Sequence, residues 1–94
     1  MKEMYTEGKF SFIVLDKEVV NKLTQIPVEE MFVTAGTAKL ISNILEFNTY
    51  SNDELQALRN SIVKDFPRND NNWTRKSMII AVIDDEKLKR GMAL

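Results

Sequence analysis

The side chains best suited to recognise a partner lie in one polar segment, residues 68–76. This segment joins the only tryptophan of the chain to three basic side chains and several asparagines. An indole beside cations can stack on a nucleic-acid base while the cations contact phosphates, but tryptophan and arginine are equally typical of protein interfaces. The structural alternative is an indole that closes the core, with its N–H bonded to a carbonyl oxygen. The candidate partner-binding residues are Arg68, Asn71, Asn72, Trp73, Arg75 and Lys76.

A second, smaller group of basic residues lies close to the C-terminus. Lys87, Lys89 and Arg90 would extend a nucleic-acid-binding groove if folding placed them beside the tryptophan. At the end of a helix they would instead complement the negative end of the helix dipole. We favour the dipole role and keep the three residues as a secondary candidate patch.

The chain has no histidine and no cysteine, which removes most catalytic designs. Without cysteine there is no disulfide, no thiolate nucleophile and no cysteine-ligated zinc. Without histidine the chain lacks the commonest general base and the commonest ligand of transition metals. An enzyme would have to work with carboxylates, hydroxyls and lysines alone. We therefore expect a protein with no catalytic residues, no cofactor and no metal site.

Three short segments resemble ligand sites, but each lacks a feature that the site would need. Residues 35–39, Ala-Gly-Thr-Ala-Lys, lack the second glycine that a phosphate-binding loop needs before its lysine. The neighbouring acids at 29–30 and 84–86 would fan out by about 100° per residue on a helix, so they would not converge on one metal ion. We assign neither a nucleotide site nor a metal site to them.

The composition is that of one ordinary globular domain, residues 1–94. Hydrophobic residues make up 44% of the chain and charged residues 29%, which is too apolar for a disordered chain. The 13 basic and 14 acidic side chains leave a net charge of −1, which argues against binding to nucleic acid or membrane through the overall charge of the protein. The longest apolar run, residues 78–83, is far shorter than the roughly 20 residues that span a bilayer. We expect a cytoplasmic protein, in the host cytoplasm if the gene belongs to a phage.

Turn and cap residues predict the elements of the first half. Residues 1–15 are expected to form a β-hairpin, with Gly8 at the position that needs a positive φ. Asp16 is the predicted N-cap of a short helix that stops before Pro27. Pro27 is then the predicted first residue of a second helix, which continues to Phe47 or breaks in two at its single glycine.

The second half begins with the clearest local signal in the chain. Ser51 and Glu54 have the spacing of a capping box, which predicts the start of a helix. Proline cannot continue a helix, so this one is expected to end at Pro67. The asparagine-rich and aspartate-rich residues 68–72 that follow are predicted to form a loop.

The apolar run at residues 78–83 is too short for periodicity to distinguish a strand from a helix. A single helix from Trp73 to Arg90 is the alternative, but it would place Arg75 and Lys76 near its positive end, so we favour a buried strand. A helix that begins at Asp84 has three acids in its first turn and basic residues in its last, as the helix dipole favours. Gly91 is a suitable residue just beyond the end of such a helix. The β-branched residues of the run also suit a strand.

Together these elements predict an α+β fold in the order β-β-α-α-α-β-α. Three to four helices would pack on a two- or three-stranded antiparallel sheet, in which the last strand pairs beside the hairpin. We expect a small non-enzymatic protein that regulates or inhibits another protein by binding it through the segment around Trp73. A nucleic-acid-binding protein that uses the same basic and aromatic residues is the alternative, and a homo-oligomer is left open.

Overall fold

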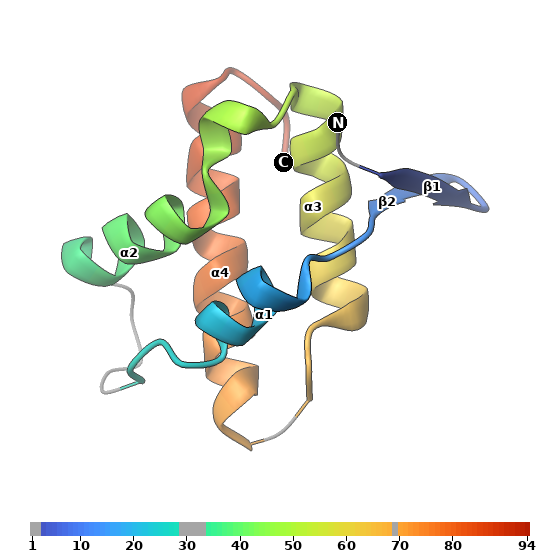
Figure 1. Ribbon diagram of the computed structural model, residues 1–94. Helices are drawn as coiled ribbons and strands as arrows, with labels where there is room; N and C mark the ends of the chain where they lie inside the picture. The colour runs from blue at the N-terminus through green and yellow to red at the C-terminus, as the bar shows by residue number, and fades with distance from the viewer. Residues whose placement is uncertain (1–2, 29–33, 69) are drawn as a thin grey trace.

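A computed structural model describes residues 3–28, 34–68 and 70–94, and the side chains of residues 70 and 71 fall outside this description. The strands are β1 (Met4–Glu7) and β2 (Phe10–Ile13). The helices are α1 (Lys17–Leu23), α2 (Ala35–Leu45), the short 3-10 helix η1 (Phe47–Thr49), α3 (Asn52–Asp65) and α4 (Asp70–Lys89). A hairpin followed by helices confirms the predicted α+β class (Figure 1).

The hairpin closes through a two-residue loop that begins with Gly8. Strands β1 and β2 are antiparallel, with Glu7 opposite Phe10 and Met4 opposite Ile13. Gly8 has a φ of 61°, a left-handed value that glycine adopts without steric penalty and that type II′ hairpin turns require at their first loop position. The predicted hairpin and its turn residue are confirmed.

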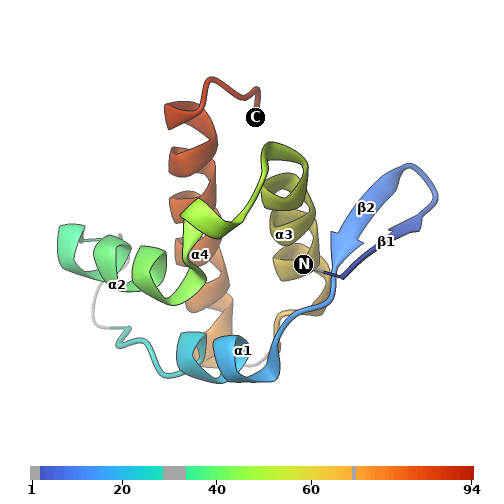
Figure 2. The same cartoon turned by 45° about the horizontal axis from the view of Figure 1, so that its top comes forward.

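The outer edge of β2 docks on α3 through side-chain hydrogen bonds. In this register the backbone groups of Ser11 and Ile13 point away from β1. The Ser61 hydroxyl accepts from the Ile13 N–H at 2.8 Å and donates to the Ile13 carbonyl at 2.7 Å. The Asn60 amide donates to the Ser11 carbonyl at 2.9 Å. Helix α3 therefore lies where a third strand would pair, as Figure 2 shows from the position of the hairpin beside α3.

Side-chain and glycine caps fix where the helices begin and end. Asp16 caps α1 as predicted, since its carboxylate accepts two backbone N–H groups of the first turn. Ser51 and Glu54 form the predicted capping box at the start of α3. Gly91, with a φ of 77°, follows α4 and completes a Schellman motif with the carbonyls of the last turn. These local signals were readable in the sequence because a few neighbouring residues carry each of them.

The core lies between α3 and α4, which run side by side, and the helices α1 and α2 that pack against this pair (Figures 1 and 2). Every described helix and strand β2 contribute apolar side chains to one continuous cluster. The described elements therefore form one small compact α+β domain. The core side chains include Ile13, Leu23, Ile26, Ile41, Leu45, Phe47, Leu55, Leu58, Ile62, Phe66, Met78, Ile79, Val82 and Ile83.

One long helix, α4, replaces the predicted third strand and the short helix that was expected to begin at Asp84. Residues 78–83 lie inside α4, and the described residues contain only the two-stranded sheet. The loop predicted at 68–72 is shortened for the same reason, since α4 starts at its third residue. Polar residues such as Asn72 and Lys87 complete the inner face of α4, so apolar residues alone do not reveal its helical period. Within the run, the buried residues keep helical spacing: Met78, Ile79, Val82 and Ile83.

The helix predicted to begin at Pro27 also has different boundaries. Pro27 lies outside any helix, and α2 begins at Ala35 with the Thr34 hydroxyl as its N-cap. Residues 29–33, which include two of the neighbouring acids, lie outside the described residues. The helix ends two residues earlier than predicted, because Glu46 takes a left-handed conformation with a φ of 55°. A hydroxyl cap and a left-handed residue thus limit α2 to a shorter segment.

Candidate functional site

The tryptophan of the predicted recognition segment is exposed on a helix rather than on a loop. Trp73 lies in the first turn of α4 and is 70% exposed. Together with Pro67, Arg68 and Lys76 it lines a hollow of about 330 Å³. Val63, near the end of α3, is 40% exposed, and its carbonyl accepts a hydrogen bond from Lys76 Nζ. We call the surface made by these five residues the Trp73 surface.

The short connection between α3 and α4 positions the Trp73 surface. Phe66 follows α3 in an extended conformation with its ring buried, and Pro67 cannot continue the helix. Helix α4 begins three residues after Pro67, so the end of one helix and the start of the next contribute to the same surface. On α4, Trp73 points outward because Asn72 and Arg75 occupy inward positions.

Asn72 and Arg75 hold the start of α4 against the segment that follows α1. Asn72 is 4% exposed, and its Oδ1 accepts a hydrogen bond from Arg75 Nη1 at 3.0 Å. Arg75 Nε donates to the carbonyl of Ile26 at 2.7 Å. The polar groups of both side chains are thus used within the fold. Asn71 lies in α4, and its side chain is outside the description.

Half of the six candidate residues come together on one surface. Sequence reasoning missed two further members, Val63 and Pro67. Val63 could have been predicted, because it is an apolar residue on the polar side of an amphipathic helix. Pro67 was interpreted only as the residue that ends this helix. The three predicted residues that share the surface are Arg68, Trp73 and Lys76.

Lys87 and Lys89, from the secondary candidate patch, are separated from the Trp73 surface by most of α4. Lys87 follows Trp73 by 14 positions, which corresponds to about 21 Å along a helix axis. Lys87 is 2% exposed, and its Nζ donates to the side-chain oxygen of Gln56 on α3. Lys89 is exposed and pairs with Asp85 one turn earlier. These residues do not extend the Trp73 surface.

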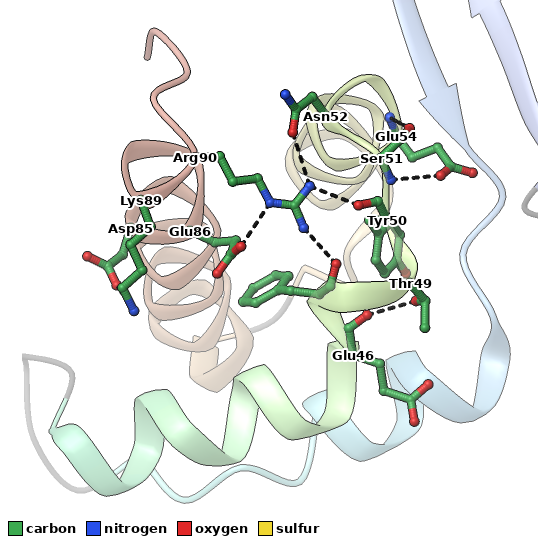
Figure 3. A network of polar contacts seen from close by, with 11 residues as sticks. Glu46, Thr49, Tyr50, Ser51, Asn52, Glu54, Asp85, Glu86, Lys89 and Arg90 are labelled. Atoms are coloured by element: carbon green, nitrogen blue, oxygen red, sulfur yellow. Dashed lines mark hydrogen bonds and ion pairs between the residues drawn. The ribbon is translucent and has the colours of Figure 1, made fainter.

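Arg90, the third residue of that patch, joins the end of α4 to the segment before α3 (Figure 3). Its guanidinium donates to the carbonyls of Phe47 at 2.7 Å and Tyr50 at 2.8 Å. It also pairs with Glu86 at 2.8 Å and donates to the side chain of Asn52 at 3.2 Å. Arg90 is therefore a structural residue that fixes η1 and the start of α3.

The neighbouring acids of α4 each bind a different cation. Asp84 accepts from Arg59 Nε on α3 at 2.6 Å. Asp85 pairs with Lys89 and Glu86 with Arg90, each four residues further along the chain. The helix fans these side chains apart, as their spacing predicts. Within the part of the chain that the structure describes, no three acidic side chains lie close enough together to hold a metal ion.

A larger hollow, of about 410 Å³, lies between the β2–α1 connection, α1, the end of α2 and α3. We call it the Tyr50 pocket. Its walls are mostly aliphatic, whereas Glu3, Asp16, Glu46, Thr49 and Tyr50 supply polar groups. Aliphatic side chains that line it include Leu15, Val19, Val20, Leu23, Ile44 and Leu58.

The negative charges around the Tyr50 pocket act on the hydroxyl of Tyr50. Burial raises the pKa of the Tyr50 hydroxyl, and the negative charges of Glu54, Glu46 and Asp16 raise it further. Figure 3 shows Glu46 and Tyr50 on the turns of chain that connect α2 to α3. The pocket has no sequence signal, because its residues come from separate segments that only the folded chain brings together.

Comparisons with known proteins give no assignment. No family model matches the chain, and no curated protein or solved structure matches it either. None of the described helices has the length and apolar character needed to cross a membrane.

Proposed function

We propose that this chain is a small non-enzymatic regulatory or inhibitory protein that binds another protein through the Trp73 surface. The observation that carries the proposal is the 70% exposure of Trp73 on a well-formed helix. A tryptophan side chain left in water keeps a large apolar area hydrated, and binding a partner would bury that area. Tryptophan is also among the residues most enriched at interface hot spots.

The neighbours of Trp73 suit a protein partner. Val63 and Pro67 extend the apolar area around the indole, and the hollow between Pro67 and Trp73 can receive an apolar side chain. Arg68 and Lys76 provide cations at the same hollow, where they favour a partner segment that carries acidic residues beside its apolar anchor. Because the surface lies where two packed helices meet, little ordering would be needed on binding.

Nucleic acid is the weaker alternative, because most of the basic side chains that it would need are bonded within the protein. Electrostatic binding to nucleic acid requires several cations that face the phosphates together. In the two candidate patches, four basic residues donate hydrogen bonds to other groups of the chain, and Lys89 pairs with Asp85. The two cations of the Trp73 surface, Arg68 and Lys76, would give only a small electrostatic contribution, and Lys76 already donates to the Val63 carbonyl. The four internally bonded residues are Arg75, Lys76, Lys87 and Arg90.

The test is capture of a partner by the tagged chain from a lysate of its own organism, with and without nuclease. Trp73→Ala is compared with Leu88→Ala, which removes a 57% exposed apolar side chain near the other end of α4. The captured protein is then purified and titrated against all three chains by calorimetry. Trp73→Ala should weaken binding at least tenfold, as hot-spot truncations do, whereas Leu88→Ala should leave it unchanged.

Other outcomes would assign the surface differently. Retention that disappears with nuclease would favour the nucleic-acid alternative. Self-association in sedimentation experiments that Trp73→Ala abolishes would make a second copy of this chain the occupant. Equal binding by Trp73→Ala and the unchanged chain would contradict the proposal.

A further inference from the structure

The Tyr50 pocket combines a volume that suits a small molecule with a defined chemical character. Close-packed interiors contain few voids bigger than a water molecule, whereas pockets for small molecules measure roughly 300–1,000 Å³. At about 410 Å³ the Tyr50 pocket falls within that range. Its deepest walls are buried aliphatic side chains, including Leu23 and Leu58, which are 0% and 1% exposed.

The charged groups that line the pocket are all of one sign. Glu3, Asp16 and Glu46 contribute carboxylates, and no lysine or arginine is among the described residues that line it. Asp16 uses one oxygen, Oδ1, to cap α1. Carboxylates beside low-dielectric aliphatic walls focus a negative potential into a hollow. The potential therefore favours a cation inside the pocket.

We propose that the Tyr50 pocket binds a small organic cation in which a protonated amine is joined to an apolar body. The apolar body would lie against the aliphatic walls contributed by α1, α2 and α3. The ammonium group, which has three donors, would face the carboxylates of Asp16 and Glu46 and the hydroxyl of Tyr50. This inference is independent of the Trp73 surface, because the two sites share no lining residue.

The backbone at the end of α2 positions one of the carboxylates that line the pocket. Glu46 is the only non-glycine residue with a positive φ in the described part of the chain. Here the left-handed turn at the end of α2 leads directly into η1 and places the Glu46 carboxylate on the lining of the pocket. The raised pKa of Tyr50 agrees with this arrangement, since carboxylates from three positions act on its hydroxyl.

The experiment is a titration of the isotope-labelled chain with 2-phenylethylammonium, followed by amide chemical shifts. Two compounds of matched shape, neutral 2-phenylethanol and anionic phenylacetate, are titrated in parallel. We expect saturable shifts for the ammonium compound at residues that line the pocket, with a dissociation constant on the order of 1 mM for so small a ligand. The neutral compound should bind several-fold more weakly, and the anion more weakly still.

Charge variants separate a role in binding from a role in folding. Asp16→Asn keeps a good N-cap, and Glu46→Gln keeps the side-chain size, while each removes one charge from the pocket. Asp16 and Glu46 are exposed, so each change should weaken binding of the ammonium compound about two- to fivefold, as expected for exposed charge pairs. Glu7→Gln makes the same chemical change outside the pocket and should leave the affinity unaltered. The amide spectrum shows directly whether each variant is folded.

Three results would overturn the inference. These are equal affinity for the ammonium and the alcohol, unchanged ammonium affinity in the Asp16→Asn/Glu46→Gln double variant, and shifts that lie outside the pocket lining. If a variant failed to fold, the comparison of the three compounds on the unchanged chain would still decide the matter. Trp73→Ala should bind the ammonium compound normally, so failure of one proposal does not imply failure of the other.

Discussion

The hydroxyl of Ser61 satisfies both backbone groups of Ile13, accepting from its N–H at 2.8 Å and donating to its carbonyl at 2.7 Å. Both residues are buried, at 0% and 3% exposure. An unpaired backbone group at such a depth would be costly. One side chain of α3 thus gives the open edge of β2 the hydrogen bonds that a neighbouring strand would otherwise supply, which is why a two-stranded sheet is sufficient here.

Replacing Ser61 with alanine should therefore loosen the hairpin from α3. The change leaves two buried backbone groups without their partner, and we expect a loss of about 1–3 kcal/mol in the free energy of unfolding. Urea unfolding followed by circular dichroism measures it. Ser77→Ala is the matched control, because Ser77 is exposed and its hydroxyl bonds only to a carbonyl of its own helix; it should change stability by less than about 0.5 kcal/mol. Equal effects of the two changes would contradict this account.

Arg90 should contribute much more to stability than its neighbour Lys89. The Arg90 guanidinium donates to two carbonyls and one carboxylate in a partly buried setting, and bonds from a charged donor contribute about 1.5–3 kcal/mol each. We expect Arg90→Met to cost about 2–4 kcal/mol, and Arg90→Lys to recover only part of it, because lysine lacks the planar fork. Lys89→Met removes an exposed ion pair and should cost at most about 1 kcal/mol. Chemical denaturation of the three variants tests this order.

The failure to predict α4 has a specific physical cause. The inner face of this helix includes Asn72, Arg75 and Lys87 in addition to its apolar residues, and these polar residues concealed the periodicity of the 20-residue helix. Their polar groups are satisfied by distant carbonyls and amides, such as the Ile26 carbonyl that binds Arg75. Those acceptors are far away in the sequence, and pattern reasoning has no access to them.

Local signals, by contrast, were sufficient for the hairpin and for the caps. Gly8, Asp16, Ser51 and Gly91 each act through residues within four positions, which is the range that sequence patterns cover. The candidate site was only partly readable for the same reason. A tryptophan among cations drew attention to a segment whose indole is exposed, but the direction of each side chain depended on the helix phase, which the sequence left ambiguous.

Glu46→Gly should not destabilise the protein, although it removes a carboxylate. A left-handed conformation costs an L-residue about 1–2 kcal/mol, and glycine avoids this cost while losing about 0.5–1 kcal/mol more chain entropy on folding. We expect the free energy of unfolding to rise by roughly 0–1 kcal/mol in thermal or urea unfolding. Glu46→Gln keeps the strained backbone and serves as the control, with little change expected. A clear loss of stability in the glycine variant would mean that the carboxylate itself holds the turn.

The Tyr50 hydroxyl should titrate above the ordinary tyrosine pKa of 10.0. Burial is the largest cause, and the charges of Glu54, Glu46 and Asp16 add to it. Ultraviolet absorbance of the phenolate measures the pKa in a Tyr5→Phe background, which leaves Tyr50 as the only tyrosine. In that background Glu46→Gln should lower the pKa toward 10.0 without reaching it, because burial remains.

The raised pKa of Tyr50 also predicts how the stability of the protein changes at alkaline pH. Above the unfolded pKa of 10.0, the unfolded chain loses the Tyr50 proton while the folded chain keeps it. The stabilisation is therefore fully present below pH 10 and declines as the pH rises through the folded pKa. Urea unfolding at a series of pH values should show a smaller decline for Tyr50→Phe, which has no proton to lose. An identical decline in both chains would assign the alkaline effect to other groups.

Trp73 should report an aqueous environment and contribute little to folding. Since it is the only tryptophan and is 70% exposed, its fluorescence should be quenched by acrylamide nearly as efficiently as that of a free tryptophan derivative. Trp73→Ala should change the free energy of unfolding by less than about 0.5 kcal/mol, as surface substitutions away from buried networks do. Asn72→Ala, one residue earlier, removes a buried amide that accepts from Arg75 and should cost about 1–3 kcal/mol. A protected indole, or a Trp73→Ala variant as unstable as Asn72→Ala, would show that the side chain belongs to the core and would remove the basis for a partner-binding role.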